Sequence, residues 1–306
     1  MSSLRQACDQ YLALRRTLGF KLKRHGALLP DLIAYLDAAG QTTVTTRLTL
    51  EWATQPAGHP QEWSVRLSIA RGFARYLRTL DGRAEVPPPD LLPRCRRRPT
   101  PYLYSDAEIA ALMAATDTLG LPLTRATYRT LIGLLAVTGM RVGEALALDR
   151  SDVDIAAGCV TVRGGKSGAA RELPLHESAL RALQEYCSVR DRRWPRPKSP
   201  AFFLSAAGTR LFYANVYRTF RGLLIQAGLP VLAGGRIPRI HDVRHSFAVA
   251  TLLDWYRAGV DVPGWMPRLS SYLGHAAPAW SYWYLQATPE LLGLAADRLE
   301  RAGRQS

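Results

Sequence analysis

The sequence predicts a mainly α-helical chain with a small antiparallel β-sheet in its second part and a separate all-α domain in its first part. Three observations predict this. Apolar residues recur at helical spacing along most of the chain, a proline-rich stretch at residues 82–101 interrupts that spacing, and two short segments alternate around a glycine-rich turn. We therefore expect two domains, residues 1–98 with the linker at their end and residues 99–306.

The first domain contains four segments in which apolar residues recur every three to four positions. Gly19 and Gly40 end the first two, as glycine commonly does after a helix. A basic loop from Lys21 to His25 is expected between them. The expected helices cover about residues 2–18, 27–39, 49–54 and 61–80.

The fourth expected helix carries arginines between its apolar positions. Arg66, Arg71 and Arg75 could form an ordinary solvated surface or contact phosphate groups. We expect phosphate contacts, because residues 1–98 hold 16 basic and 8 acidic side chains. Among the prolines of the linker, Arg96 and Arg97 are expected to contact the same polyanion.

Helices also dominate the second domain. Ser105 is placed to cap the first of them, and Glu108 three residues later would complete a capping box. Further helices are expected over residues 124–137, over residues 177–193, and in a segment that ends before Gly228.

A small sheet and a glycine-bounded turn interrupt these helices. Residues 159–163 and 171–175 alternate like strands, and the glycine-rich residues 164–168 between them predict a hairpin tip. Upstream, Gly139 and Gly143 flank Arg141, which enters a short helix.

The chain is strongly basic in both halves. Its 40 Lys and Arg against 25 Asp and Glu give a net charge of +15, of which residues 1–98 carry +8 and residues 99–306 carry +7. The charge is therefore not confined to a tail, and a large polyanion is the natural partner. A basic composition by itself would promote only solubility and weak anion binding.

Cysteine usage and hydropathy indicate the compartment. The four cysteines are widely spaced with no C-x-x-C pair, which predicts neither a zinc site nor a disulfide framework and fits a reducing environment. No signal peptide is visible, and the longest apolar run, Leu131 to Val137, is too short to span a bilayer. We expect a cytoplasmic protein without membrane association.

The stretch from His241 to Tyr284 concentrates groups suited to chemistry on a phosphodiester. His241 lies three residues before Arg244, and His275 lies nine residues before Tyr284. Cationic and imidazole donors can neutralise phosphoryl oxygens, and a tyrosine can attack phosphorus without a metal. The rest of the chain is expected to supply further donors and to hold DNA.

Five motifs in register resemble the tyrosine recombinase (phage integrase) family across about residues 99–306. They are Thr138-Gly139-Met140-Arg141-Val142-Gly143-Glu144, Lys166 in its hairpin, His241-x-x-Arg244, Leu273-Gly274-His275 and Tyr284. The ending from Tyr282 to Leu292 is more similar to transposon-encoded members than to Xer proteins. Residues 1–98 resemble the family's helical core-binding domain only in shape and charge.

The resemblance implies that Arg141 and Arg244 grip the non-bridging oxygens of the scissile phosphate. Guanidinium forks suit this role because they donate two parallel hydrogen bonds and stay charged. Glu144, one helical turn after Arg141, is expected to orient Arg141 or the neighbouring helix. A plain surface carboxylate is the alternative.

Lys166 is the expected general acid for the leaving 5′ oxygen. Only four of the 40 basic residues are lysines, and a lysine at a hairpin tip suggests a proton that can be released. The second lysine that the family often has three positions later is Ala169 here. A solvated turn lysine is the alternative.

His241 and His275 are expected to donate to the phosphate or to help take the tyrosine proton. Core histidines satisfied by hydrogen bonds are the alternative, and His245 is expected only to support packing. A three-histidine metal site is a further alternative, but no acidic ligand is well spaced beside these histidines. We therefore expect no metal and no cofactor.

Tyr284 is the expected nucleophile, and Tyr282 is its competitor. Attack would give a 3′-phosphotyrosyl link and a free 5′ hydroxyl, which conserves the bond energy for rejoining. On a helix the two side chains would differ by about 200° of rotation, so both cannot face one phosphate. The distance from His275 favours Tyr284.

Together these features predict a site-specific recombinase that acts on double-stranded DNA as a homo-oligomer, a tetramer on DNA, in transposition or integration of a mobile element. The alternatives are a catalytically inactive sequence-specific DNA-binding protein and a type IB topoisomerase-like enzyme that relaxes DNA. A tail helix from Pro289 to about Gly303 is expected to dock on a neighbouring protomer or on its own domain.

Overall fold

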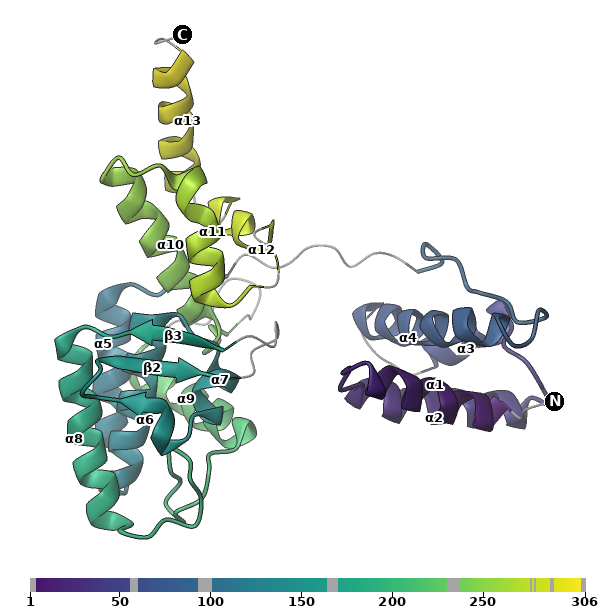
Figure 1. Ribbon diagram of the computed structural model, residues 1–306, viewed down its shortest axis with the longest axis horizontal. Coiled ribbons are helices and arrows are strands. Elements are labelled where there is room, and N and C mark those ends of the chain that lie inside the picture. Colours follow the sequence, from purple (N-terminus) through teal and green to yellow (C-terminus); the bar gives the residue numbers. More distant parts are fainter. Residues whose placement is uncertain are drawn as a thin grey trace. The chain divides into compact units, whose positions relative to one another are not determined.

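The computed structural model divides the chain into two compact units, Met1–Pro99 and Thr100–Ser306 (Figure 1). No described helix is long and apolar enough to cross a membrane. The structure describes residues 4–55, 60–92, 101–163, 170–229, 237–275, 277, 279–286 and 289–303.

Four helices build the first unit around one apolar core, in which Leu32, Trp52 and Phe73 are at most 1% exposed. The second helix begins at Lys23, so Lys23 to His25 form its first turn and not the basic loop expected from the sequence. The helices are α1 (Leu4–Thr17), α2 (Lys23–Ala38), α3 (Thr46–Thr54) and α4 (Pro60–Arg78).

The first half of the second unit is helical at its start and then forms the sheet. The capping box expected at Ser105 is confirmed, since its hydroxyl accepts from the backbone N–H of Glu108 while the Glu108 carboxylate accepts from that of Ser105. The elements are α5 (Asp106–Ala115), η1 (Thr116–Thr118), α6 (Pro122–Thr138), α7 (Val142–Ala147), η2 (Arg150–Asp152), β1 (Val153–Asp154), β2 (Cys159–Val162) and β3 (Arg171–Pro174).

In the described part of the second half of this unit every named element is a helix, and residues 194–212 between α8 and α9 form a loop with isolated β-bridges. Helix α13 continues beyond α10 and α11, away from the sheet of the same unit (Figure 1). The elements are α8 (Glu177–Arg193), α9 (Tyr213–Gln226), α10 (Asp242–Arg257), α11 (Val262–Leu273), α12 (Ala279–Tyr282), η3 (Trp283–Gln286) and α13 (Pro289–Gly303).

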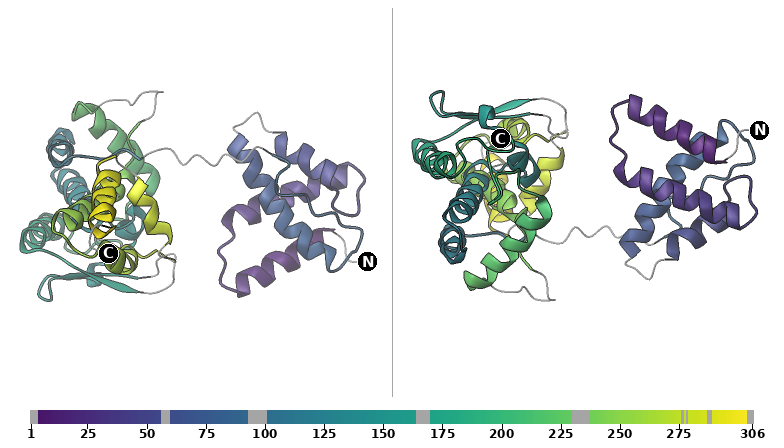
Figure 2. Two further views of the ribbon diagram at one scale, coloured as in Figure 1. Left: turned by 90° about the horizontal axis from the view of Figure 1, so that it is seen from above. Right: turned by 90° about the horizontal axis from the view of Figure 1, so that it is seen from below.

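The sheet is antiparallel in the order β1-β2-β3. Val160 pairs with Val153 on one side and with Leu173 on the other, and the side chains of Val160 and Leu173 are fully buried. The sheet therefore turns one face to the core and lies at one edge of the unit in both views of Figure 2. The expected fold class is confirmed, and β1 is an addition because two residues leave no alternating pattern.

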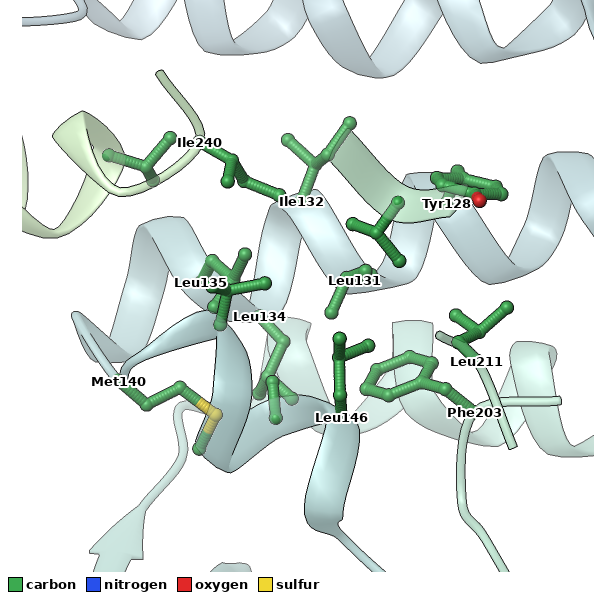
Figure 3. Close-up of a cluster of buried hydrophobic side chains, with 14 of the residues drawn as sticks. Tyr128, Leu131, Ile132, Leu134, Leu135, Met140, Leu146, Phe203, Leu211 and Ile240 are labelled. Atoms are coloured by element: carbon green, nitrogen blue, oxygen red, sulfur yellow. The ribbon is translucent and has the colours of Figure 1, made fainter. Parts of the chain in front are cut away.

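The core of the second unit anchors two segments that carry candidate residues. Met140 and Ile240 belong to one buried cluster around α6, with exposures of 1% and 3% (Figure 3). Arg141 directly follows Met140, and His241 directly follows Ile240. Because Met140 and Ile240 are packed in the core, they fix the backbone position from which each polar side chain extends.

A smaller apolar cluster joins α10, α11, η3 and the first turn of α13. Its members Leu273, Tyr284 and Leu291 are at most 3% exposed. The cluster brings the end of α11 and the aromatic segment of η3 against α10, which carries Arg244 in its first turn.

Candidate active site

Arg244 bridges the C-terminal ends of two helices. Its Nη1 donates to the carbonyl of Gly139 at the end of α6, and its Nη2 donates to the carbonyl of Leu273 at the end of α11, both at 2.8 Å. The last carbonyls of a helix lack intrahelical partners and carry partial negative charge. A guanidinium that is only 3% exposed therefore satisfies both ends at once.

Glycine is required at both helix ends. Gly139 has φ 58° and Gly274 has φ 66°, in the left-handed region that other residues rarely adopt. A Cβ at Gly139 would collide with the ring of Phe247, and a Cβ at Gly274 would lie 2.7 Å from Nη1 of Arg171. The sequence motifs that contain these glycines thus have a steric basis.

Arg141 is held at the start of α7 by Glu144 and by the turn after α11. Its Nη1 donates to Oε1 of Glu144 at 2.7 Å, and its Nη2 donates to the carbonyl of Gly274 at 2.9 Å. Glu144 is 9% exposed, so it is not the surface carboxylate considered as an alternative. Burial raises the pKa of Glu144, but hydrogen bonds from Arg171 and Arg141 outweigh it and hold that pKa below its ordinary value.

The same turn leads to His275, which faces Tyr284. The two rings stack with centroids 6.0 Å apart, and Nδ1 of His275 lies 2.7 Å from the hydroxyl of buried Ser281. Burial lowers the pKa of Arg244, while the neighbouring Tyr284 phenol acts in the opposite direction. The structure thus brings Tyr284, His275 and Arg244 together.

Tyr282 occupies a different environment from Tyr284. Tyr282 ends α12 and is 47% exposed, whereas Tyr284 lies in the 3₁₀ turn η3 and is 3% exposed. The two tyrosines do not lie in one regular helix as expected, but their side chains still face different environments, one solvent and the other the core.

His241 and His245 complete the histidine cluster. Burial and the nearby Arg244 and Arg239 lower the pKa of His241. The ring of His245 lies 5.0 Å from that of His241 and 5.5 Å from that of Tyr284, centroid to centroid. Burial, followed by His241, lowers the pKa of His245 to about 4. Its Nδ1 is buried without a hydrogen-bond partner among the described atoms.

Two sets of predicted residues lie outside the part of the chain that the structure describes. They are Lys166 with the hairpin tip, and Arg96 with Arg97 in the linker. Within the described residues, no group of three or more His, Cys, Asp or Glu side chains is arranged to hold a metal ion.

The arginines predicted to contact phosphate on α4 differ in their surroundings. Arg66 is 8% exposed, pairs with Asp31 at 3.1 Å and packs over the ring of Trp52, so the structure corrects the prediction that it contacts DNA. Arg71 donates to the carbonyls of residues 87 and 88 and thereby holds the proline segment. Arg75 is exposed, so its side chain is accessible to a phosphate group, and the predicted contact stays a prediction.

One exposed surface was not singled out from the sequence. Tyr213, Tyr217 and Arg221 are spaced four residues apart on α9, and the Arg221 guanidinium lies 6.0 Å from the Tyr217 ring centroid. Phe212 before the helix is 71% exposed. Residues Phe202 to Tyr217 are rich in aromatic side chains, but only the fold shows which rings face outward.

Two arginines beside a phenol and an imidazole are the kinds of group that attack of a tyrosine on a phosphodiester requires. The chain belongs to the phage integrase family, which it matches over residues 103–290. It is a tyrosine-type site-specific recombinase.

Two similar sequences support the assignment, and one solved structure shares the fold. The Sinorhizobium fredii protein named "Putative integrase/recombinase y4rB" is 42% identical over 98% of both chains. Tyrosine recombinase XerC of Chlamydia trachomatis is 30% identical over 69% of this chain and 62% of its own length. A Tn1549 transposon integrase, solved in complex with transposon right end DNA, shares the fold with a TM-score of 0.68 at 16% identity, over 96% of this chain and 98% of that one.

Proposed function

We propose that the protein cuts and rejoins double-stranded DNA through a 3′-phosphotyrosyl intermediate formed by Tyr284. The observation that carries this proposal is the meeting of Tyr284 and His275 with Arg244, next to a second arginine held on the same turn. Arg141 is 24% exposed in its side chain, which leaves it accessible to a phosphate.

In the proposed step, Oη of Tyr284 attacks the scissile phosphorus, the Oη–P bond forms and the P–O5′ bond breaks. Arg141 and Arg244 stabilise the charge that develops on the non-bridging oxygens. Burial and the nearby Arg244 and Arg141 lower the pKa of His275 to about 4, so its imidazole is neutral near pH 7 and can accept a hydrogen bond from the Tyr284 phenol, whose proton passes on to solvent as the bond to phosphorus forms. Lys166 gives a proton to the leaving 5′ oxygen, and the reverse reaction restores the duplex.

Double-stranded DNA as the substrate is supported by the charge of +15 and by two exposed surfaces. Arginine side chains give salt-dependent contacts with phosphates, and aromatic rings can contact bases and sugars. In the second unit the surface of Phe212, Tyr213, Tyr217 and Arg221 on α9 suits such contacts. In the first unit we propose Arg75 as a phosphate contact.

Action in transposition or integration, as a tetramer on DNA, is the finer part of the proposal. Similarity to an integrase/recombinase over nearly the whole chain supports integration, and the fold shared with a transposon integrase fits transposition. The extension of α13 past α10 and α11 suits contact with a second protomer (Figure 1). The cytoplasm is the proposed site of action.

A suicide duplex tests the proposal. A nick just 3′ of the scissile phosphate lets the short 5′-hydroxyl strand diffuse away, so a covalent protein–DNA adduct accumulates. We expect an adduct on duplexes from the ends of the mobile element that carries the gene and none on scrambled duplexes. Site-specific binding without an adduct would indicate an inactive DNA-binding protein. Relaxation of supercoiled plasmid without exchange between two duplexes would indicate a topoisomerase.

A further inference from the structure

Arg171, the first residue of β3, is not among the site residues predicted from the sequence, yet it contacts the site. Its Nη2 donates to Oε2 of Glu144 at 2.7 Å, its Nη1 lies 3.4 Å from Oε1, and its Nε donates to the carbonyl of Tyr272 at 2.8 Å. Its side chain is only 12% exposed. Each of its three nitrogens therefore has a protein acceptor.

Three successive carbonyls at the end of α11 each accept from a different arginine. Arg171 takes the carbonyl of Tyr272, Arg244 takes that of Leu273, and Arg141 takes that of Gly274. These arginines come from β3, α10 and the start of α7. The turn before His275 is thus held by all three elements.

Arg171 also shapes that turn by occupying space. A Cβ on Gly274 would lie 2.7 Å from its Nη1 and 2.9 Å from its Cζ, so the guanidinium packs directly against the glycine. Any change at Arg171 that leaves a void would remove one of the three arginine contacts that hold the turn before His275.

The charge balance around Glu144 gives Arg171 a second effect. A buried Glu144 paired with Arg141 alone would form a neutral pair and weaken the attraction of Arg141 for a phosphate. With Arg171 on the same carboxylate, the group of three keeps one net positive charge.

We propose that Arg171 is a positioning residue for DNA cleavage. It fixes Glu144 and the Tyr272–Gly274 turn, and it offsets the charge of Glu144 so that Arg141 retains its attraction for the scissile phosphate. Arg171 itself does not touch the DNA, because each of its nitrogens is already turned to a protein acceptor and its side chain is only 12% exposed. The inference rests on the proposed function.

The test compares two substitutions on two substrates. Arg171→Gln removes the charge and the fork, and Arg171→Lys keeps the charge without the fork. One suicide duplex carries the ordinary scissile phosphodiester, and the other carries a methylphosphonate there. Replacing a non-bridging oxygen with methyl removes a negative charge, so cleavage then depends less on Arg141.

On the phosphodiester we expect Arg171→Gln to slow adduct formation by about a hundredfold, as expected for a misplacement of about 1 Å, and Arg171→Lys to slow it by about tenfold. Duplex binding should stay within about twofold of the unchanged protein. On the methylphosphonate both losses should shrink to within about threefold, as should that of Arg141→Ala.

The matched control is Arg163→Gln. Arg163 directly follows β2, next to the pairing partner of Arg171, but its side chain is 67% exposed and its ion pair is with Asp152. We expect this variant to cleave both substrates at the unchanged rate. Thermal unfolding of every variant shows whether it folds, and either Arg171 variant that folds suffices for the comparison.

Two results would overturn the inference. One is cleavage of the phosphodiester by Arg171→Gln at the unchanged rate. The other is a loss of equal size on both substrates, which would mean that Arg171 serves only the stability of the fold. Absence of an adduct from the unchanged protein and from Arg163→Gln would instead contradict the proposed function.

Discussion

Tyr284 and His275 lie ring against ring, with centroids 6.0 Å apart and an interplanar angle of 18°. The contact joins the turn after α11 to η3, two segments that the apolar cluster of α10 and α11 holds together. It selects one of two neighbouring tyrosines, because Tyr282 is 47% exposed and Tyr284 is 3% exposed.

Tyr284→Phe is therefore expected to abolish the covalent adduct while duplex binding stays near normal, since only the hydroxyl is removed. Tyr282→Phe is the matched control and should leave the adduct intact. Mass spectrometry of the trapped adduct locates the linked residue. An adduct formed by Tyr284→Phe and mapped to Tyr282 would show that the wrong tyrosine has been chosen.

Arg244→Ala is expected to lose cleavage by about a hundredfold or more, because each lost donor to the transition state costs that much. Duplex binding should fall far less. The free energy of unfolding should also fall by about 1–3 kcal/mol, since the carbonyls of Gly139 and Leu273 lose their partner. Single-turnover cleavage, binding and denaturant titrations separate these effects. Equal losses of binding and cleavage would make Arg244 a general phosphate contact.

Lys166→Ala is expected to cleave an ordinary suicide duplex slowly and to regain its rate on a duplex with a 5′-bridging sulfur. A thiolate is a better leaving group than an alkoxide and needs no general acid. The control is Arg244→Ala, which the sulfur should not rescue because its defect lies at the non-bridging oxygens. If sulfur leaves Lys166→Ala slow, Lys166 acts in positioning and not as the acid.

The candidate site could be predicted from the sequence because its chemistry is carried by side chains at fixed spacings. Arg141, Arg244, His275 and Tyr284 were each placed by motif, and the structure brings them to the ends of α6 and α11. The helices followed from apolar periodicity, whereas the start of α2 was misplaced because charged residues at Lys23 and Arg24 do not distinguish a first turn from a loop.

Other features depended on long-range packing that no local pattern carries. Arg66 falls among exposed-looking arginines of α4, yet its guanidinium lies on Trp52, a residue of α3. Arg171 gained its partners only because β3 lies against Glu144 and Tyr272, 27 and 101 residues away. In a chain with 40 basic residues, spacing alone could not single out these two.

Acidification should destabilise the protein before it protonates the carboxylates. Burial, with smaller contributions from nearby cations and imidazoles, lowers the pKa of His245 and of His275 to about 4, below their ordinary 6.5. Between these values the unfolded chain binds more protons than the folded chain, so stability is full above about pH 6.5 and falls as the pH drops toward 4. Denaturation midpoints at pH 7 and pH 5 measure this.

The control for the pH effect is His275→Gln, which removes one titrating group. The difference between its midpoints at pH 7 and pH 5 should be smaller than that of the unchanged protein. An equal difference would mean that His275 titrates normally. Cleavage near neutrality should show no step at pH 6.5 from these histidines, because both are already neutral there.

The last prediction concerns α13, whose first turn has one buried side and one exposed side. Leu291 is fully buried in the cluster that contains Tyr284, and Glu290 pairs with Arg257 at 2.7 Å, so this turn packs on its own unit. Leu292 is 53% exposed on the neighbouring side of the helix. The exposed side is the part available to a second protomer.

Removing the residues after Thr288 should weaken the pairing of two DNA duplexes and spare binding to a single site, but it also removes Leu291 from beneath Tyr284. Leu292→Glu is the sharper variant, because a charge on the exposed side disfavours an apolar contact between protomers and leaves Leu291 in place. It should form the adduct on a single suicide duplex at the unchanged rate and lose exchange between two duplexes. Asp297→Asn, an exposed substitution on the same helix, is the control and should keep both adduct formation and exchange at the unchanged rate. Full exchange by both Leu292→Glu and the truncated chain would rule out a role of α13 between protomers.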